Sequence, residues 1–357
     1  MIFIDENIPR LADALKPAGE VTTFSGRELT NSDLKSSGCK YLFVRSTTKL
    51  NEELLEGTEV EFIATATAGT DHFDWQYLDK TNIKCVSAEG GNSNSVAEYP
   101  VYAALKYVTD NNLDPKDLKV GVIGFGCIGK KVAKYFHDFG FRVLINDSIL
   151  KAEGYQFPEK YRYGKIPEIF TECDIITNHV PLSSDSKHPT VSWFDRYWLG
   201  MMKENSLFIH TSRGKILVEN DALSFAQEGK LNFALDVWEH EPDFHPELAK
   251  LCMLATAHIG AYSAQGKING AKIVAEKFSE YSGQKIDNKV FKIENEPERF
   301  DSSELNLDEA LKLLEERRKL QSDSENLVSL TNLDEGARKK GFDKLRKEYL
   351  VRFETLK

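Results

Sequence analysis

A chain of 357 residues is too long to fold around one compact core, so two or three domains are expected. Apolar residues make up 41% of the chain and charged residues 29%, which is typical of globular proteins and excludes the disordered, fibrous and disulfide-rich classes. The formal net charge of −10 disfavours nucleic acid or an anionic membrane as a partner, because both carry charge of the same sign.

The cysteines and the N-terminus predict where the protein works. The five cysteines are scattered, with no pair at the spacing of a metal site or a redox motif, so buried thiols in a reducing cytoplasm and no metal are expected. The N-terminus lacks the pattern of a signal peptide, and no stretch approaches the roughly 20 apolar residues of a membrane-spanning helix. We therefore expect a cytoplasmic protein.

Residues 1–94 have the pattern of a parallel α/β domain. Short β-rich runs such as 41–44 and 61–64 alternate with helical segments. A helix is then predicted from about Ser95 to Thr109, with a kink at Pro100, because proline removes a helical hydrogen bond. This helix leads into a second domain, which we place at residues 95–262.

The second domain is predicted to be a doubly wound parallel sheet. Five strand-like runs alternate with helical or turn-rich segments, and they cover residues 119–123, 142–146, 175–178, 207–210 and 233–237. The helix predicted at 267–281 carries its apolar side chains on one face, so residues 263–285 are expected to return to the first domain. The predicted fold class is therefore α/β, with two doubly wound parallel-sheet domains.

Residues 286–357 are predicted to form a third, small α+β domain. Two apolar stripes with helical spacing interrupt its highly charged composition, and they consist of Leu307, Ala310, Leu311 and Leu314, and of Phe342, Leu345 and Tyr349. Asn306 and Glu309 have the spacing of a capping box. Because the segment is too small to own a core, we expect these stripes to be buried against a partner.

A dinucleotide site is predicted at the start of the second domain. Gly124, Gly126, Ile128 and Gly129 belong to a G-x-G-x-x-G run that follows an apolar strand and precedes a helix. The glycines allow the tight turn, the approach of a pyrophosphate and close packing of helix and strand, and the helix N-terminus faces the phosphates. Asp147 ends the next strand, where its carboxylate suits a ribose diol and repels a 2′-phosphate, so the cofactor is expected to be NAD.

Three polar clusters follow later strands of the second domain, and they contain Arg213, Glu241 and His258. Each residue alone is readily explained as a surface cation, a solvated acid or a buried histidine. Together they match the oxidation of a 2-hydroxy acid, which needs a base for the hydroxyl proton, a cation for the carboxylate and an acid that fixes the tautomer of the base. Because strand ends in an open α/β sheet converge on one crevice, we predict Arg213, Glu241 and His258 as a catalytic trio.

These motifs resemble the D-isomer-specific 2-hydroxyacid dehydrogenase family over roughly residues 1–285. Within that family the strongest resemblance is to the erythronate-4-phosphate dehydrogenases of pyridoxal 5′-phosphate biosynthesis. Four runs carry it, and they are Asp5-Glu-Asn7-x-Pro9, residues 44–51, residues 65–72 and residues 342–350. The resemblance implies NAD-dependent oxidation of 4-phospho-D-erythronate. It also implies that the C-terminal domain makes a homodimer.

The resemblance assigns further site residues. It implies that Ser46, Thr67 and Tyr262 contact the substrate and that Asp236 lies near the nicotinamide carboxamide. It also implies that the segment of Thr211, Ser212 and Arg213 lines the NAD site together with Ala261. Val180 occupies a position where the resembling enzymes offer a threonine to the cofactor, so one hydrogen bond is in doubt there. His240 stands between Glu239 and Glu241, and we interpret it as a bystander.

Positive charge beside Ser46 suggests how a phosphorylated substrate is bound. We hypothesise that Arg45 and Lys49, with Arg346 from a partner subunit, bind the 4-phosphate. The alternative is that Arg45 and Lys49 are solvated or paired with acids.

Two rival functions stay open. One is a dehydrogenase for phosphoglycerate, glyoxylate or hydroxypyruvate, which the 342–350 run disfavours. The other is a non-catalytic dinucleotide-sensing interaction protein, because a fold alone does not prove chemistry.

Overall fold

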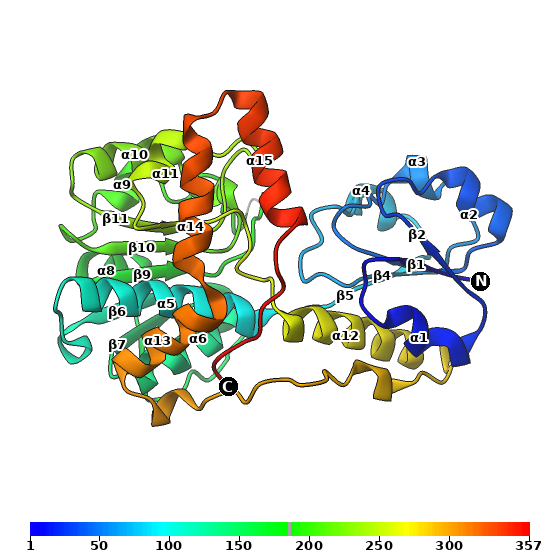
Figure 1. The fold of residues 1–357 in the computed structure, drawn as a ribbon, viewed down its shortest axis with the longest axis horizontal. Helices are drawn as coiled ribbons and strands as arrows, with labels where there is room; N and C mark the ends of the chain where they lie inside the picture. Colours follow the sequence, from blue (N-terminus) through cyan, green and yellow to red (C-terminus); the bar gives the residue numbers. More distant parts are fainter. Residues whose placement is uncertain (185–186) are drawn as a thin grey trace. The chain divides into compact units, whose positions relative to one another are not determined.

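The computed structural model describes residues 1–184 and 187–357 (Figure 1). The chain divides into two compact units, one of residues 1–92 and 263–296 and one of residues 93–262 and 297–357. Each unit contains one sheet in which every strand pair is parallel. The predicted fold class of two doubly wound parallel-sheet domains is therefore confirmed.

The first unit has the strand order β2-β1-β3-β4-β5. Its strands are β1 (Ile2–Asp5), β2 (Val21–Phe24), β3 (Tyr41–Val44), β4 (Phe62–Thr65) and β5 (Lys84–Ser87), and its helices are α1 (Leu11–Leu15), α2 (Asn31–Ser37), α3 (Glu52–Leu55), α4 (Trp75–Leu78) and α12 (Ala264–Ser282). In this order the direction of winding reverses between β1 and β3. Ligands bind at such a reversal, outside the carboxyl ends of the strands.

Helix α12 covers one face of this sheet. Its side chains Ala271, Val274, Ala275 and Phe278 are fully buried, and the Phe278 ring packs edge-on against Phe43 and Phe62. The apolar stripe read from the sequence is thus the face that packs on the core. Residues 286–296, which we expected to open the third domain, belong to this first unit.

The second unit has the strand order β12-β11-β10-β9-β6-β7-β8. Its strands are β6 (Lys119–Ile123), β7 (Arg142–Asn146), β8 (Arg162–Tyr163), β9 (Ile175–Asn178), β10 (Leu207–His210), β11 (Asn232–Leu235) and β12 (Leu254–Ala255), and the helices up to residue 262 are α5 (Ser93–Asp110), α6 (Cys127–Asp138), α7 (Ser148–Ala152), α8 (Ile166–Glu172), α9 (Arg196–Leu199), α10 (Glu219–Gln227) and α11 (Pro246–Leu251). The winding reverses between β6 and β9, beside the glycine run. Helix α5 runs through Pro100 without interruption and is buried over most of its length.

The C-terminal segment is helical and packs on the second unit. Its helices are α13 (Leu307–Arg318), α14 (Leu320–Ser329) and α15 (Glu335–Lys347), drawn in orange to red in Figure 1. Helix α14 lies beside the edge strand β12, where the Ala255 backbone N–H donates to Ser324 Oγ at 2.9 Å. In the described residues, the expected β structure of this segment is limited to a bridge between Phe300 and Leu356.

The apolar stripes of this segment are covered by their own chain, which corrects the expectation of burial against a partner. Ala310 and Leu314 are fully buried in the core formed with α5 and α6, and Phe342 is fully buried against Phe244. The predicted capping box of Asn306 is confirmed. A stripe with helical spacing shows that a face is buried, but it does not show which chain covers it.

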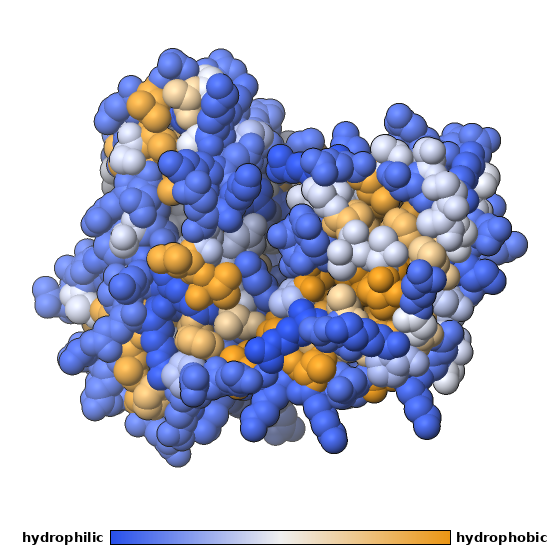
Figure 2. Space-filling view, turned by 45° about the vertical axis from the view of Figure 1, so that its right-hand side comes forward, coloured by the Kyte–Doolittle hydropathy of each residue, from blue (hydrophilic) through white to orange (hydrophobic). Residues whose placement is uncertain are grey.

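The surface agrees with the composition. Hydrophilic side chains predominate on the face shown in Figure 2, and apolar ones lie in separate patches. Within residues 1–184 and 187–357, none of the helices combines the length and hydrophobicity needed to span a bilayer. Cys127 is exposed, so the expectation that the cysteines are buried is wrong for this one.

Candidate active site

The glycine run forms an open turn between β6 and α6. Gly124 has a φ of 89°, and a Cβ atom there would lie 2.9 Å from the His179 carbonyl. A Cβ atom on Gly129 would lie 1.9 Å from the Gly124 oxygen, so this position tolerates only glycine. Gly126, in contrast, has no atom within 4 Å of such a position. The turn therefore keeps open space at the start of α6, where a pyrophosphate fits.

Asp147 is fixed against this turn. One of its carboxylate oxygens accepts the Phe125 backbone N–H at 2.9 Å, and the other accepts that of Leu150 at 3.0 Å. The carboxylate thus stands at the carboxyl end of β7, next to the glycine run. An anion at this position fits two ribose hydroxyls and repels a 2′-phosphate.

The other predicted cofactor residues lie on loops after β9, β10 and β12. The Val180 backbone nitrogen lies 3.1 Å from the position that a Cβ atom on Gly124 would take. Ser212 Oγ accepts from Asn178 at 2.8 Å. The buried Thr211 Oγ1 has no hydrogen-bond partner among the described residues. An orphaned buried hydroxyl on the loop after β10 fits a site for a polar cofactor.

Asp236 organises the loop that carries His258. It directly follows β11, and its two carboxylate oxygens accept the backbone N–H groups of Ile259 and Gly260 at 2.8 and 2.9 Å. Thr256 Oγ1 donates to the same carboxylate at 2.6 Å. Burial raises the pKa of Asp236. His258 itself has a φ of 55°, a conformation that this network stabilises.

Glu241 and His258 form a close pair. His258 Nδ1 lies 2.8 Å from Glu241 Oε2, and Glu241 Oε1 accepts the Trp238 backbone N–H at 3.0 Å. Burial acts to raise the pKa of Glu241, but the contact with His258 and the other hydrogen bonds outweigh it and hold the pKa below its usual value. An ionised Glu241 accepts a hydrogen bond from His258 when Nδ1 carries the proton. In this tautomer the Nε2 lone pair of His258 is available as a base.

Arg213 lies on the neighbouring loop. Its Nη1 donates to the Ser212 carbonyl at 2.8 Å, and its own carbonyl lies 2.8 Å from His210 Nε2. Burial lowers the pKa of His210 to about 4, so this imidazole is neutral and fixes the backbone of Arg213. The three residues of the predicted trio thus follow β10, β11 and β12, three adjacent strands of one sheet.

Glu219 escaped the sequence analysis, His240 was interpreted there as a bystander, and Arg346 was expected at the site only from a partner subunit. Glu219 is buried, accepts the Glu239 backbone N–H at 2.7 Å, and has its pKa raised to about 7 by burial. Arg346 of the same chain lies 4.0 Å from Glu241 Oε2 through Nη1 and 3.5 Å from Tyr262 Oη through Nη2. His240 is 71% exposed and lies 3.8 Å from Glu239. No sequence pattern reveals the Arg346 contact, because it joins residues more than 80 positions apart.

The predicted substrate residues of the first unit lie at the carboxyl ends of its strands. Arg45 Nε lies 3.1 Å from Asp5, a buried carboxylate at the end of β1, so Arg45 is paired with an acid. Thr67 Oγ1 lies 2.8 Å from Thr65 Oγ1. A cavity of about 420 Å³ lies here, and it is lined by Ser46, Lys49, Leu50, Asn51, Asp71, His72, Phe73 and Asp74.

Lys267 is a further cation in this region. It lies in the first turn of α12, and desolvation together with the nearby Arg45 cation lowers its pKa. Sequence analysis could not select it, since lysines on amphipathic helices are common.

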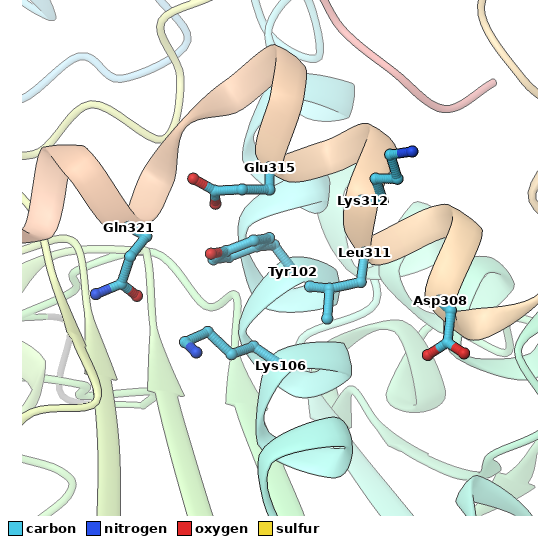
Figure 3. Close-up of a pocket in the computed structure, with 7 residues that line it drawn as sticks. All are labelled: Tyr102, Lys106, Asp308, Leu311, Lys312, Glu315 and Gln321. Atoms are coloured by element: carbon cyan, nitrogen blue, oxygen red, sulfur yellow. The ribbon is translucent and has the colours of Figure 1, made fainter.

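A second cavity, of about 410 Å³, belongs to the other unit and is separate from the predicted site residues. Side chains from α5 face those of α13 and α14 across it (Figure 3). Its lining consists of Tyr102, Lys106, Asp308, Leu311, Lys312, Glu315 and Gln321.

Comparison with known proteins identifies the family of this chain. Residues 105–260 match the family of D-isomer specific 2-hydroxyacid dehydrogenases, NAD binding domain. The chain is 38% identical to an erythronate-4-phosphate dehydrogenase of Bacteroides thetaiotaomicron over 76% of this chain and 77% of that protein. It is 34% identical to that of Hahella chejuensis over 98% of this chain and 91% of that protein, so the similarity includes the C-terminal segment.

Solved structures share the fold at lower identity. The NAD-bound 3-phosphoglycerate dehydrogenase of Entamoeba histolytica has a TM-score of 0.66 and 23% identity, covering 83% of this chain and 98% of that one. The D-lactate dehydrogenase of Aquifex aeolicus, solved with NAD and lactic acid, has a TM-score of 0.61 and 23% identity, covering 79% and 96%.

Proposed function

Because this chain belongs to the D-isomer-specific 2-hydroxyacid dehydrogenase family and, within it, to the erythronate-4-phosphate dehydrogenases, we propose that it oxidises 4-phospho-D-erythronate. The product is 2-oxo-3-hydroxy-4-phosphobutanoate, an intermediate of pyridoxal 5′-phosphate biosynthesis. The chain is an NAD-dependent dehydrogenase. The observation that carries the assignment is the 2.8 Å contact between His258 Nδ1 and Glu241 Oε2, on the loops that follow strands β12 and β11.

The residues at the glycine turn suit NAD. The space beside Gly126, the carboxylate of Asp147 and the unpartnered hydroxyl of Thr211 offer a pyrophosphate site, a ribose contact and a polar contact. Ile128, Val180, Ser212 and Ala261 complete the proposed lining. When bound, NAD accepts the hydride from C2 of the substrate.

His258 is the proposed general base. Its Nε2 takes the proton of the C2 hydroxyl, while Glu241 holds Nδ1 and stabilises the imidazolium that forms. Arg213 binds the substrate carboxylate, because a guanidinium grips a carboxylate with two parallel hydrogen bonds and stays charged at all working pH values. Asp236 keeps the His258 loop in place and is a positioning residue in this scheme.

The phosphate of the substrate is assigned to the first unit. We infer that Arg45, Lys49 and Lys267 supply its positive charge, with Ser46 and Thr67 donating hydroxyl hydrogen bonds. Support comes from the cavity lined by Ser46 and Lys49 and from the proximity of Arg45 and Lys267. Among the described residues, the ion pair of Arg45 with Asp5 uses Nε, and we assign its two Nη groups to the phosphate. Tyr262 of the second unit is the remaining proposed substrate contact.

We also propose that the protein is a cytoplasmic homodimer. In the C-terminal segment Leu350 is 77% exposed, and Val351 and Leu333 are each 44% exposed. Exposed apolar residues favour contact with a second copy of the chain. Free cysteines, one of them exposed, suit a reducing compartment.

Neither rival has better support. Other 2-hydroxy acids use the same chemistry, and a non-catalytic sensor has no need of a histidine fixed by a carboxylate in one tautomer. The decisive experiment assays NAD reduction, or cofactor reoxidation, against phosphorylated and plain 2-hydroxy and 2-oxo acids. We expect 4-phospho-D-erythronate to have the highest kcat/KM. His258→Ala should sharply lower turnover while sparing NADH affinity, and unchanged turnover would rule out the base.

A further inference from the structure

Helix α15 contacts the loop that carries Glu241 along one face. Arg338, Phe342 and Arg346 recur every four residues, so they project from the same side of the helix. Arg338 Nη2 lies 3.0 Å from Asp243, and the Phe342 ring stacks on Phe244 at 5.9 Å. Two of these positions of α15, Arg338 and Phe342, therefore contact Asp243 and Phe244 of the same chain.

The third contact reaches the proposed catalytic pair itself. Arg346 Nη1 lies 4.0 Å from Glu241 Oε2, the same oxygen that His258 Nδ1 contacts at 2.8 Å. The Nη2 group of Arg346 lies 3.5 Å from Tyr262 Oη, and its buried Nε has no hydrogen-bond partner among the described residues. The guanidinium is thus held beside the Glu241 carboxylate by charge and by one long hydrogen bond to Tyr262.

The loop needs such support. Residues 239–244 follow β11 without helix or strand, so no backbone ladder fixes them. Phe244 and Phe342 are both buried, at 1% and 0% exposure, so α15 supplies part of the apolar environment that this loop requires. The ion pair of Arg338 and Asp243 is partly buried, with 14% of the arginine side chain and 31% of the aspartate side chain exposed, and Lys339 Nζ lies 3.3 Å from the other oxygen of Asp243.

The same segment also contacts the loop of His258. Arg318 at the end of α13 is fully buried and donates from Nη2 to the Gly260 carbonyl at 3.0 Å. The Tyr349 ring packs edge-on against Tyr262 at 5.5 Å, and its hydroxyl lies 3.1 Å from Asp323. The C-terminal segment therefore contacts both loops that bring Glu241 and His258 together.

We propose that α15 braces residues 241–244, and that Arg346 is a positioning residue that acts through Glu241 on His258, so that the C-terminal segment completes the catalytic centre of its own chain. The proposal rests on the roles of Glu241 and His258 given above. It assigns this segment a function in catalysis that does not depend on a second copy.

The test compares Arg346→Gln, Arg346→Lys and Arg338→Gln with Lys340→Gln. Lys340 is exposed on the same helix, so its change removes the same charge without touching the loop. We expect Arg346→Gln to lower kcat by about 10- to 100-fold, because small misplacement of a catalytic group is costly. KM for 4-phospho-D-erythronate and the Kd for NADH should stay within about twofold. Arg346→Lys should recover much of kcat, and Lys340→Gln should match the unchanged protein.

A second measurement needs no substrate. Amide hydrogen exchange of residues 239–244 should speed up in Arg338→Gln and Arg346→Gln, and not in Lys340→Gln, because a loop released from its brace opens more often.

Three results would overturn the brace. A rise in KM for the phosphorylated substrate with unchanged kcat would mean that Arg346 binds substrate directly. Loss of activity that follows dissociation in sedimentation velocity, and that returns at high protein concentration, would mean that α15 acts through an interface. Unchanged kcat in Arg346→Gln would also contradict it.

Glu241→Gln and His258→Ala separate this proposal from the function on which it rests. If both are as active as the unchanged protein, the proposed function fails. If both are impaired while Arg346→Gln is not, only the brace fails.

Discussion

Gly214 lies so close to Trp238 that a Cβ atom on Gly214 would be 1.9 Å from the Trp238 carbonyl oxygen. This contact joins the loop after β10, which carries Arg213, to the loop after β11, which carries Glu241. Arg213, the proposed substrate anchor, and Glu241, the proposed partner of the base, lie on these two loops. The loops can keep their spacing because glycine at position 214 has no Cβ atom.

Gly214→Ala should separate these two loops. The new methyl group cannot fit against backbone atoms, so we expect kcat to fall by about 100-fold and stability by roughly 1–3 kcal/mol. Steady-state kinetics and urea unfolding measure the two effects. Gly336→Ala is the control, because the nearest atom to its Cβ is 3.5 Å away. Full activity in Gly214→Ala would show that the loops shift freely.

Gly126 and Gly129 should respond differently to the same change. The Cβ of Gly126→Ala meets no atom within 4 Å, so the fold should keep its melting temperature, while the methyl group occupies the space assigned to the pyrophosphate. We expect its Kd for NADH to rise by at least about tenfold. Gly129→Ala should instead destabilise the protein, because its Cβ would lie 1.9 Å from the Gly124 oxygen. Titration of NADH fluorescence and thermal unfolding distinguish these results, and equal NADH affinity in Gly126→Ala would argue against a pyrophosphate at this turn.

Much of the fold could be predicted because its signals are local. The five expected strands of the second unit and the glycine run are apolar runs and turn residues at short spacing, and all five strands are present within about two residues. The pairing of Glu241 with His258 could be anticipated because parallel strands align their carboxyl ends. These features depend on neighbours along the chain or on one property of parallel sheets.

The C-terminal segment shows what could not be predicted. The stripe that contains Ala310 and Leu314 indicates a buried face in any packing, so it could not distinguish burial on α5 from burial on a second copy. Arg346 beside Glu241 and Arg45 beside Asp5 are pairs between distant positions, and no periodicity encodes them. Glu219 looks like an ordinary helix residue in the sequence, and only burial makes its carboxylate unusual.

Arg45→Ala and Lys267→Ala test the phosphate assignment. Each removes one cation from the region of Ser46, so KM for 4-phospho-D-erythronate should rise by about tenfold or more. KM for a plain 2-hydroxy acid such as glycerate should change little, since that substrate has no distal anion. Lys35→Ala, an exposed cation on α2, serves as the control. Equal changes with both substrates would remove these residues from phosphate recognition.

Arg318→Met should unfold part of the C-terminal segment. Its buried partner Glu98 lies 2.7 Å away and also accepts the backbone N–H of Leu356. Leaving Glu98 uncompensated in the core should cost about 3–5 kcal/mol. Adding Glu98→Gln should restore part of the loss, because the remaining group is then neutral. Denaturant unfolding of the single and double variants measures this coupling, and additive losses would contradict it.

Glu219→Gln should change the pH dependence of stability. Burial raises the pKa of Glu219 from 4.5 to about 7, so the folded protein holds this proton more tightly than the unfolded chain does. Below pH 4.5 the Glu219 carboxyl group is protonated in both the folded and the unfolded state, so no charge is buried on folding. As pH rises toward 7 the unfolded chain ionises first, so stability is lost, by about 3 kcal/mol once the pH exceeds the folded pKa.

Glutamine imitates the protonated form and can still accept the Glu239 backbone N–H. The variant should therefore match the unchanged protein near pH 4.5 and exceed it by up to about 3 kcal/mol at pH 8. Urea unfolding at several pH values gives the difference, with Glu316→Gln as an exposed control. A difference that stays constant between pH 4.5 and 8 would mean that Glu219 ionises normally in the folded protein, and that the region around Glu239 is more hydrated than its burial indicates.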